Sequence, residues 1–178
     1  MNRQCWLTIG LLACGITAAH AQLGPPMSAY ARGNTRIYQD ATADTGTILR
    51  KELKWTSRIP LDKTWEQLTP KQKDEMRSLY ERLGPNDEPP FPVEGMTPIF
   101  NALQKAQHIL QAKGELYMVV SVDSQGIATK VEDMGGVHDI QMTETAQQIL
   151  LLTKYKPGSC SGNPCYMVFP FKLALKNR

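Results

Sequence analysis

The chain has no block of like charge and, after its first 21 residues, no long apolar run. Lysine and arginine number 20 against 17 acidic residues, and no basic cluster stands out. The sequence therefore predicts neither a nucleic-acid partner nor binding to an anionic membrane. No later segment approaches the roughly 20 apolar residues of a spanning helix, so we expect no membrane span after residue 21.

The chain also lacks the residue groupings that metal sites and catalytic centres require. His108 lies on a predicted helix and His138 in a predicted loop, and neither has ligand spacing with another side chain. Ser121, Ser124 and Ser159 have no histidine placed to activate them. No glycine-rich phosphate loop follows a strand. We therefore expect no catalytic residue, metal ion or cofactor, and we expect that the protein is not an enzyme.

The first 21 residues have the three-part pattern of a cleaved bacterial secretion signal. Arg3 supplies the leading positive charge, and residues 5–19 are apolar and uncharged. Ala19-His20-Ala21 then places small residues at the two positions that a signal peptidase reads. We expect cleavage between Ala21 and Gln22, which puts the rest of the chain in the periplasm.

A second processing route is open within the same segment. Residues 11–14 (LLAC) resemble the lipobox of bacterial lipoproteins, in which the cysteine is lipidated and becomes the first mature residue. Leu12 is not the usual residue at its position in that motif. Lipidation of Cys14 would make the protein a lipoprotein, and it remains the alternative to release as a soluble periplasmic chain.

Two cysteines remain after the signal. Cys160 and Cys165 bracket the turn-forming sequence Ser-Gly-Asn-Pro. In an exported protein such a pair indicates a disulfide. The alternative is a redox-active pair, but its usual spacing is Cys-x-x-Cys. We predict a structural disulfide.

Residues 22–89 form an extension that ends in a helix. Residues 22–48 show no sustained period, and alternation around Trp55 suggests a strand over residues 53–59. A helix is predicted over residues 69–83, because Thr69 and Gln72 form a capping box. A Pro-rich connector follows and marks the expected boundary at residue 89. Trp55 and Trp65 lie in this extension, as core residues or as anchors for a partner.

Residues 90–178 alternate between helical and strand patterns. Helices are predicted over residues 97–113 and 143–155, a hairpin over 114–132 and a final strand over 166–176. Pro170 cannot donate to a strand ladder, so it indicates an edge strand or a bulge. The fold class is therefore α+β: a small antiparallel sheet packed by two helices and preceded by a helical extension.

The order and motifs of this region resemble the TonB C-terminal domain family. Residues 114–126 (GELYMVVSVDSQG) look like the family's first hairpin, and residues 154–157 (KYKP) look like the end of its second helix. Residues 169–171 (FPF) look like its last strand. Phe91-Pro92 loosely echoes the aromatic-Pro pair that precedes the family's first helix. The resemblance covers about residues 90–176.

The resemblance implies a periplasmic module that binds a segment of an outer-membrane receptor or another envelope protein by adding it as a strand. It implies that the last strand offers the binding edge. Such an edge also allows two copies to pair, so a homodimer is open. The candidate edge residues are Tyr166, Val168, Pro170 and Lys172.

The sequence departs from an energy-transducing TonB protein. We expect a cleaved signal in place of a retained membrane anchor, and the chain shows no long Pro-rich spacer. We therefore expect an interaction module that does not itself transduce energy. The alternative is an envelope enzyme or enzyme inhibitor that uses the fold as a scaffold, with residues 30–68 forming a cleft.

Overall fold

The computed structural model describes residues 46, 49 and 59–176, which belong to one compact unit of the chain. The predicted secretion signal lies outside the described residues, and so do Cys14, Ala21 and Gln22. The strand predicted around Trp55 also lies outside them, because residues 50–58 are not described.

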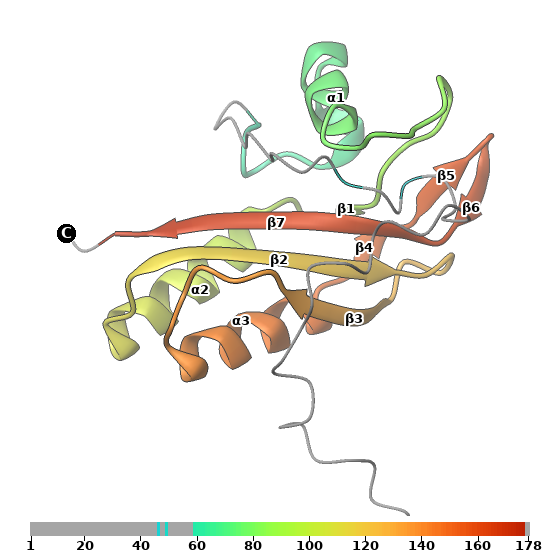
Figure 1. Cartoon of the computed structure of the whole chain (residues 1–178). Helices are drawn as coiled ribbons and strands as arrows, with labels where there is room; N and C mark the ends of the chain where they lie inside the picture. The colour runs from blue at the N-terminus through green and yellow to red at the C-terminus, as the bar shows by residue number, and fades with distance from the viewer. Residues whose placement is uncertain (1–45, 47–48, 50–58, 177–178) are drawn as a thin grey trace, which may run out of the picture. The chain divides into compact units, whose positions relative to one another are not determined.

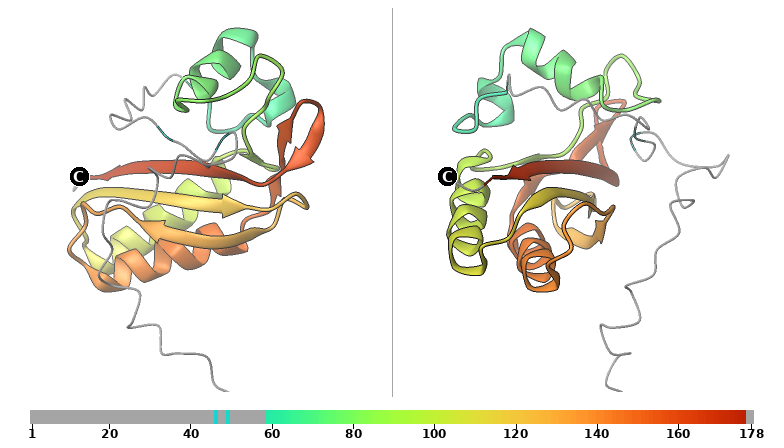
Figure 2. Two further views of the ribbon diagram at one scale, coloured as in Figure 1. Left: turned by 45° about the vertical axis from the view of Figure 1, so that its right-hand side comes forward. Right: turned by 60° about the vertical axis from the view of Figure 1, so that its left-hand side comes forward.

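The centre of the fold is a three-stranded antiparallel sheet (Figure 1). It contains β2 (Gly114–Val122), β3 (Ala128–Asp133) and β7 (Met167–Leu175), in the order β3-β2-β7. Two helices, α2 (Thr97–Leu110) and α3 (Ile140–Leu152), pack side by side against one face (Figure 2). This confirms the predicted α+β class.

The β2–β3 hairpin follows directly from the sequence. Alternate residues of β2 point into the helical face, and the turn between the strands is set by Asp123. Its Oδ1 accepts the backbone N–H groups of Gln125 and Ile127, each at 2.9 Å. Gly126 has a φ of +79°, which few other residues adopt readily.

The two helices that pack on the sheet, α2 and α3, have bounds that differ from the predicted ones because of the residues at their ends. Helix α3 starts at Ile140 because the Asp139 carboxylate accepts the N–H of Met142 at 2.9 Å. It ends at Leu152, and the next residues form β4 (Tyr155–Lys156), which pairs with β1 (Phe91–Pro92). Helix α2 ends when Gln111 turns left-handed (φ 54°), before the glycine that we expected to stop it.

The extension contributes a short 3-10 helix, η2 (Trp65–Gln67), and α1 (Pro70–Arg77). The capping box predicted at the start of α1 is present between Thr69 and Gln72. The helix is shorter than predicted, because the residues after it bond back over three positions and tighten the chain into turns. Helix α1 lies beyond β7, on the side of that strand away from β2 (Figures 1 and 2).

One hydrophobic core joins the extension to the sheet. The Trp65 and Phe91 ring centroids are 5.9 Å apart, and Phe91 meets Phe169 of β7 edge to face at 6.2 Å. The predicted boundary at residue 89 therefore does not separate two cores, because apolar residues on both sides of it pack together. Buried residues from the extension include Ile59, Trp65, Leu68, Met76, Leu79 and Tyr80.

No helix in the described part of the chain is long and apolar enough to cross a membrane.

Candidate functional site

The outer side of β7 is the candidate binding edge. Its nine residues pair with β2 without a bulge, from Gly114 opposite Leu175 to Val122 opposite Met167. In an antiparallel pair, alternate residues direct both backbone groups to the neighbouring strand or away from it. The backbone N–H and carbonyl of Val168 point away from β2. Because the direction alternates along the strand, the backbone groups of Pro170, Lys172 and Ala174 also point away from β2.

The start of this edge is closed by the chain itself, which corrects the prediction at Val168. The Val168 N–H donates to the carbonyl of Gly46 at 3.2 Å, and its carbonyl accepts the Tyr80 hydroxyl at 2.7 Å. Val168 is buried. Tyr166 precedes the strand, and its hydroxyl donates to Ser121 Oγ at 2.9 Å. Val168 therefore offers a partner neither its backbone N–H nor its carbonyl.

The second half of the edge is open among the described residues. Pro170 is buried, and its missing N–H would point outward, which explains why the strand tolerates it. Within residues 59–176 no backbone group bonds to the N–H of Lys172 or Ala174. Ala174 is exposed, and Lys172 Nζ pairs with Glu115 at 2.9 Å. The predicted edge thus narrows to residues 170–175.

The opposite edge of the sheet, along β3, is partly covered by α3 and β4. Ile127 bridges Lys154, and the Tyr155 N–H donates to the carbonyl of Gly126 at 3.1 Å. The amide of Gln147, on α3, reaches the Val131 carbonyl at 3.5 Å. Each edge is therefore covered over part of its length, and β7 is the edge that the sequence motifs favour.

A second structural unit near β7 is the cysteine hairpin. Strands β5 (Gly158–Cys160) and β6 (Asn163–Cys165) pair antiparallel. The predicted disulfide is confirmed between Cys160 and Cys165, with Cα atoms 5.8 Å apart. A disulfide fits an extracytoplasmic location, where such bonds persist.

The hairpin is fastened to the loop that follows α1. Glu88 and Ser159 exchange two backbone hydrogen bonds of 2.9 and 2.8 Å. The buried Asp87 carboxylate accepts the N–H of Ser161 with Oδ1 and the N–H of Gly84 with Oδ2, both at 2.8 Å. The hairpin that the disulfide closes is therefore bonded to a loop that is remote from it in sequence. No motif in the sequence indicated this role for Asp87.

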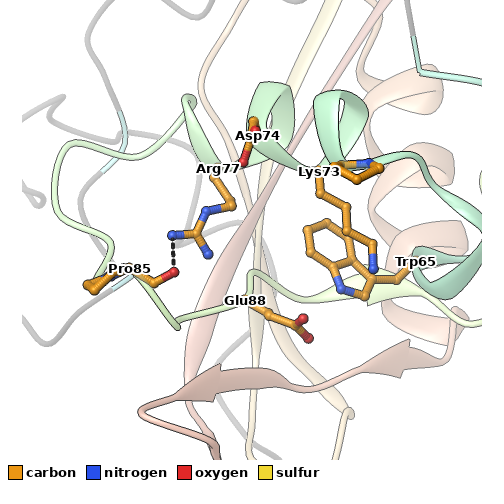
Figure 3. Close-up of a pocket in the computed structure, with 7 residues that line it drawn as sticks. Trp65, Lys73, Asp74, Arg77, Pro85 and Glu88 are labelled. Atoms are coloured by element: carbon orange, nitrogen blue, oxygen red, sulfur yellow. Dashed lines mark hydrogen bonds between the residues drawn. The ribbon is translucent and has the colours of Figure 1, made fainter.

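A pocket of about 280 Å³ lies between α1 and this loop (Figure 3). Arg77 forms one wall and donates hydrogen bonds to three backbone carbonyls, those of Gly84 (2.7 Å), Pro85 (2.9 Å) and Asp87. We call it the Trp65 pocket. Its lining residues are Trp65, Pro70, Lys73, Asp74, Arg77, Pro85 and Glu88.

Charged groups surround the indole of Trp65. Lys73 Nζ lies 5.4 Å from the ring centroid and Lys156 Nζ lies 5.5 Å from it. Lys156 also pairs with Glu88 Oε2 at 2.7 Å. Burial of Glu88 opposes its ionisation, but the hydrogen bond from Lys156, the nearby indole N–H and the two lysine charges outweigh burial and lower the pKa of Glu88.

Trp65 itself is a core residue, with 2% of its surface exposed. This fits the core alternative of the two that the sequence left open for it. Its Nε1 is buried and meets no acceptor at hydrogen-bonding geometry in the described part of the chain. In Figure 3 the ring edge that carries Nε1 faces the carboxylate of Glu88. The interaction between the indole N–H and this carboxylate is one of the causes that lower the pKa of Glu88.

The remaining residues weighed from sequence do not converge. Ser121 is buried in β2, where its hydroxyl meets Tyr166, while His108 and His138 are exposed. In the part of the chain that the structure describes, no three His, Cys, Asp or Glu side chains form a group that could hold a metal ion.

Comparison with known proteins gives no match: no family model fits the chain, and no curated protein or solved structure is significantly similar to it. The TonB-like resemblance therefore stays a prediction from sequence motifs. The function proposed below rests on the geometry of β7 and on these motifs.

Proposed function

We propose that this protein is an interaction module of the bacterial cell envelope, resembling the TonB C-terminal domain. It binds an extended segment of a partner protein, which adds as a strand to the second half of β7. The observation that carries the proposal is the outer side of Lys172 and Ala174 at the edge of the sheet, whose backbone groups bond to none of the residues that the structure describes. The sequence motifs favour an outer-membrane receptor segment as the partner and the periplasm as the location.

The physical basis is the pairing of backbone groups. An exposed edge strand presents N–H and C=O groups that an extended peptide can complete, which gives affinity with little dependence on sequence. Here the outward groups are the carbonyl of Pro170 and both backbone groups of Lys172 and Ala174. Strand β7 is held in place by β2, with which it pairs along its whole length. A partner therefore meets a preformed template.

Proline substitution at Lys172 tests this mode directly. Lys172→Pro removes one outward N–H, and Pro170 shows that this strand accommodates proline two residues earlier at an equivalent position. Lys172→Ala removes the same side chain and keeps the N–H, so it is the matched control. Val168→Pro would be a poor choice, because that N–H bonds to Gly46 within the chain.

The probes are synthetic heptapeptides that carry TonB-box segments, with scrambled peptides as controls. We expect Lys172→Ala to bind like the wild type and Lys172→Pro to bind about fivefold more weakly, because one backbone hydrogen bond is lost. Amide hydrogen exchange should slow at Lys172 and Ala174 when peptide is bound. Equal binding by Lys172→Pro, or unchanged exchange at both amides, would rule out strand addition at this edge.

A further inference from the structure

The start of the β7 edge is occupied by a residue of the same chain, Gly46. We propose that Gly46 is an autoinhibitory stop, whose carbonyl takes the place of a partner's carbonyl at Val168 and so limits the length of the segment that can dock. This proposal rests on the proposed function, because it concerns strand addition at the same edge.

Gly46 lies where the first residue of an added strand would bond. The N–H groups of Val168, Lys172 and Ala174 point away from β2, because outward positions recur at every second residue. Pro170, between them, has no N–H. The Val168 N–H donates to the Gly46 carbonyl at 3.2 Å. Gly46 therefore supplies at Val168 the acceptor that a partner would supply at the two later positions.

The position of Gly46 requires glycine. Its φ is +74°, a conformation that residues with a side chain disfavour. A Cβ atom there would lie 2.4 Å from Sδ and 2.6 Å from Cγ of Met167, which is fully buried. Movement of the sulfur alone would not relieve this clash, because Cγ lies near the base of the side chain. An alanine at position 46 should therefore withdraw the carbonyl from Val168.

The bonds of Gly46 are the weaker of the contacts that close the start of the edge. Its N–H donates to the carbonyl of Arg82, and its carbonyl accepts the Val168 N–H, both at 3.2 Å, the long end of the usual range. Tyr80 holds the Val168 carbonyl at 2.7 Å and belongs to the hydrophobic core. Gly46 can therefore leave while Tyr80 stays, which frees the Val168 N–H but not its carbonyl.

Release of Gly46 would lengthen the docking edge from residues 170–175 to residues 168–175. A binding site that is only partly populated in its open form binds more weakly in proportion to that population. A short segment that pairs with residues 170–174 should not sense Gly46. A longer segment that reaches Val168 should compete with it.

Peptides of two lengths test this stop. The probes are a TonB-box heptapeptide, long enough to span residues 168–174, and the two pentapeptides made by trimming it from either end. The measured quantity is the dissociation constant of the tighter pentapeptide divided by that of the heptapeptide. We expect this ratio to rise about fivefold in Gly46→Ala, because one further backbone hydrogen bond forms.

Gly135→Ala is the matched control. Gly135 also has a positive φ, +103°, but a Cβ atom there would meet nothing within 4 Å. The ratio should equal that of the wild type in this variant. A rise as large as in Gly46→Ala would mean that backbone strain, and not the release of Val168, changes peptide binding.

Amide hydrogen exchange gives a second measurement, which in the wild type needs no substitution. The heptapeptide should speed exchange at the Gly46 N–H, because it displaces that residue from Arg82 and Val168, and the pentapeptides should not. In Gly46→Ala without peptide, exchange at Val168 should be faster than in the wild type, and the heptapeptide should slow it again.

The outcomes separate this stop from the function on which it rests. An unchanged ratio in Gly46→Ala, or unchanged exchange at Gly46 with the heptapeptide bound, would overturn the stop and leave strand addition standing. Equal weakening of both lengths in Gly46→Ala would mean that Gly46 supports the edge, which also overturns it. If no peptide bound the wild type and exchange at Lys172 and Ala174 stayed unchanged, strand addition itself would be wrong, and the stop with it.

Discussion

The hydroxyl of Tyr80 donates a 2.7 Å hydrogen bond to the carbonyl oxygen of Val168, a residue 88 positions further along the chain. Tyr80 is buried, and its burial raises the pKa of the phenol. This bond joins the segment after α1 to the edge strand of the sheet. It also satisfies a buried carbonyl on the outer side of the strand, so that this carbonyl is not available to a partner.

Tyr80→Phe should lower the free energy of unfolding by about 1–2 kcal/mol, because the Val168 carbonyl is left buried without a donor. Urea denaturation at pH 7 measures this. Tyr166→Phe is the control, since Tyr166 is 42% exposed and its bond to Ser121 is more easily replaced by water. If both variants lost the same free energy of unfolding, the buried Tyr80 bond would contribute no more to stability than the exposed Tyr166 bond.

The same tyrosine should make the fold sensitive to high pH. Its pKa is raised in the folded chain, so the unfolded chain ionises first, near a pKa of about 10, and stability falls as the pH rises through that value. Tyr80→Phe should fall less steeply between pH 9 and 11. Tyr117 and Tyr155 also have raised pKa values, so some dependence should remain. If the stabilities of the wild type and of Tyr80→Phe fell in parallel between pH 9 and 11, Tyr80 would not be the source of the pH dependence.

Removing the disulfide should weaken the cysteine hairpin and the loop attached to it. The double variant Cys160→Ser, Cys165→Ser is expected to lose about 2 kcal/mol of stability, because the bond closes only a short loop. In the wild type, both thiols should resist alkylation until a reductant is added, as mass spectrometry would show. Label on the unreduced protein would mean that the bond is not formed in the isolated chain.

Glu88 should contribute stability that acid removes. Its pKa is lowered in the folded chain, so its contribution is present above the unfolded value of about 4.3 and is lost as the pH falls through the folded value. Glu88→Gln should be less stable than the wild type at pH 7 and equal to it near pH 3. Glu66→Gln, at an exposed position, is the control. A constant difference across this range would exclude the proposed ion pair as its source.

A chain that begins at residue 90 should not fold cooperatively. It would lose Trp65, Met76 and Tyr80, which are buried in the same core as the sheet. A chain that begins at residue 59 keeps them and should show a single urea transition by circular dichroism. A cooperative transition in the shorter chain would support the domain boundary that the sequence suggested at residue 89.

Local patterns predicted the elements of this fold well. The capping box at Thr69, the turn residue Asp123 and the alternation of β7 each act through neighbours within a few positions, so they can be recognised without a structure. The errors at the helix ends have the same local origin. Asp139 caps α3 earlier than its apolar pattern suggested, and Gln111 ends α2 in a conformation usually left to glycine.

The candidate sites depend on contacts that no local pattern reveals. Gly46 and Tyr80 close the beginning of the β7 edge, and both are distant from Val168 in sequence. The Trp65 pocket lies between α1 and a loop that Arg77 holds through three backbone carbonyl groups. The sequence correctly predicted which strand would lie at the edge, since Pro170 requires it, but not which part of that edge the chain itself would occupy.

Strand β7 is apolar at every position except Lys172, and a strand of that composition with an open side is prone to aggregate with other copies of itself. Pro170 interrupts the outer ladder in the middle, and Tyr80 with Gly46 occupies its beginning. A second molecule can therefore form only a short, weak ladder before it reaches the proline. The residues that limit where a partner docks should thus also limit edge-to-edge pairing between copies of this chain.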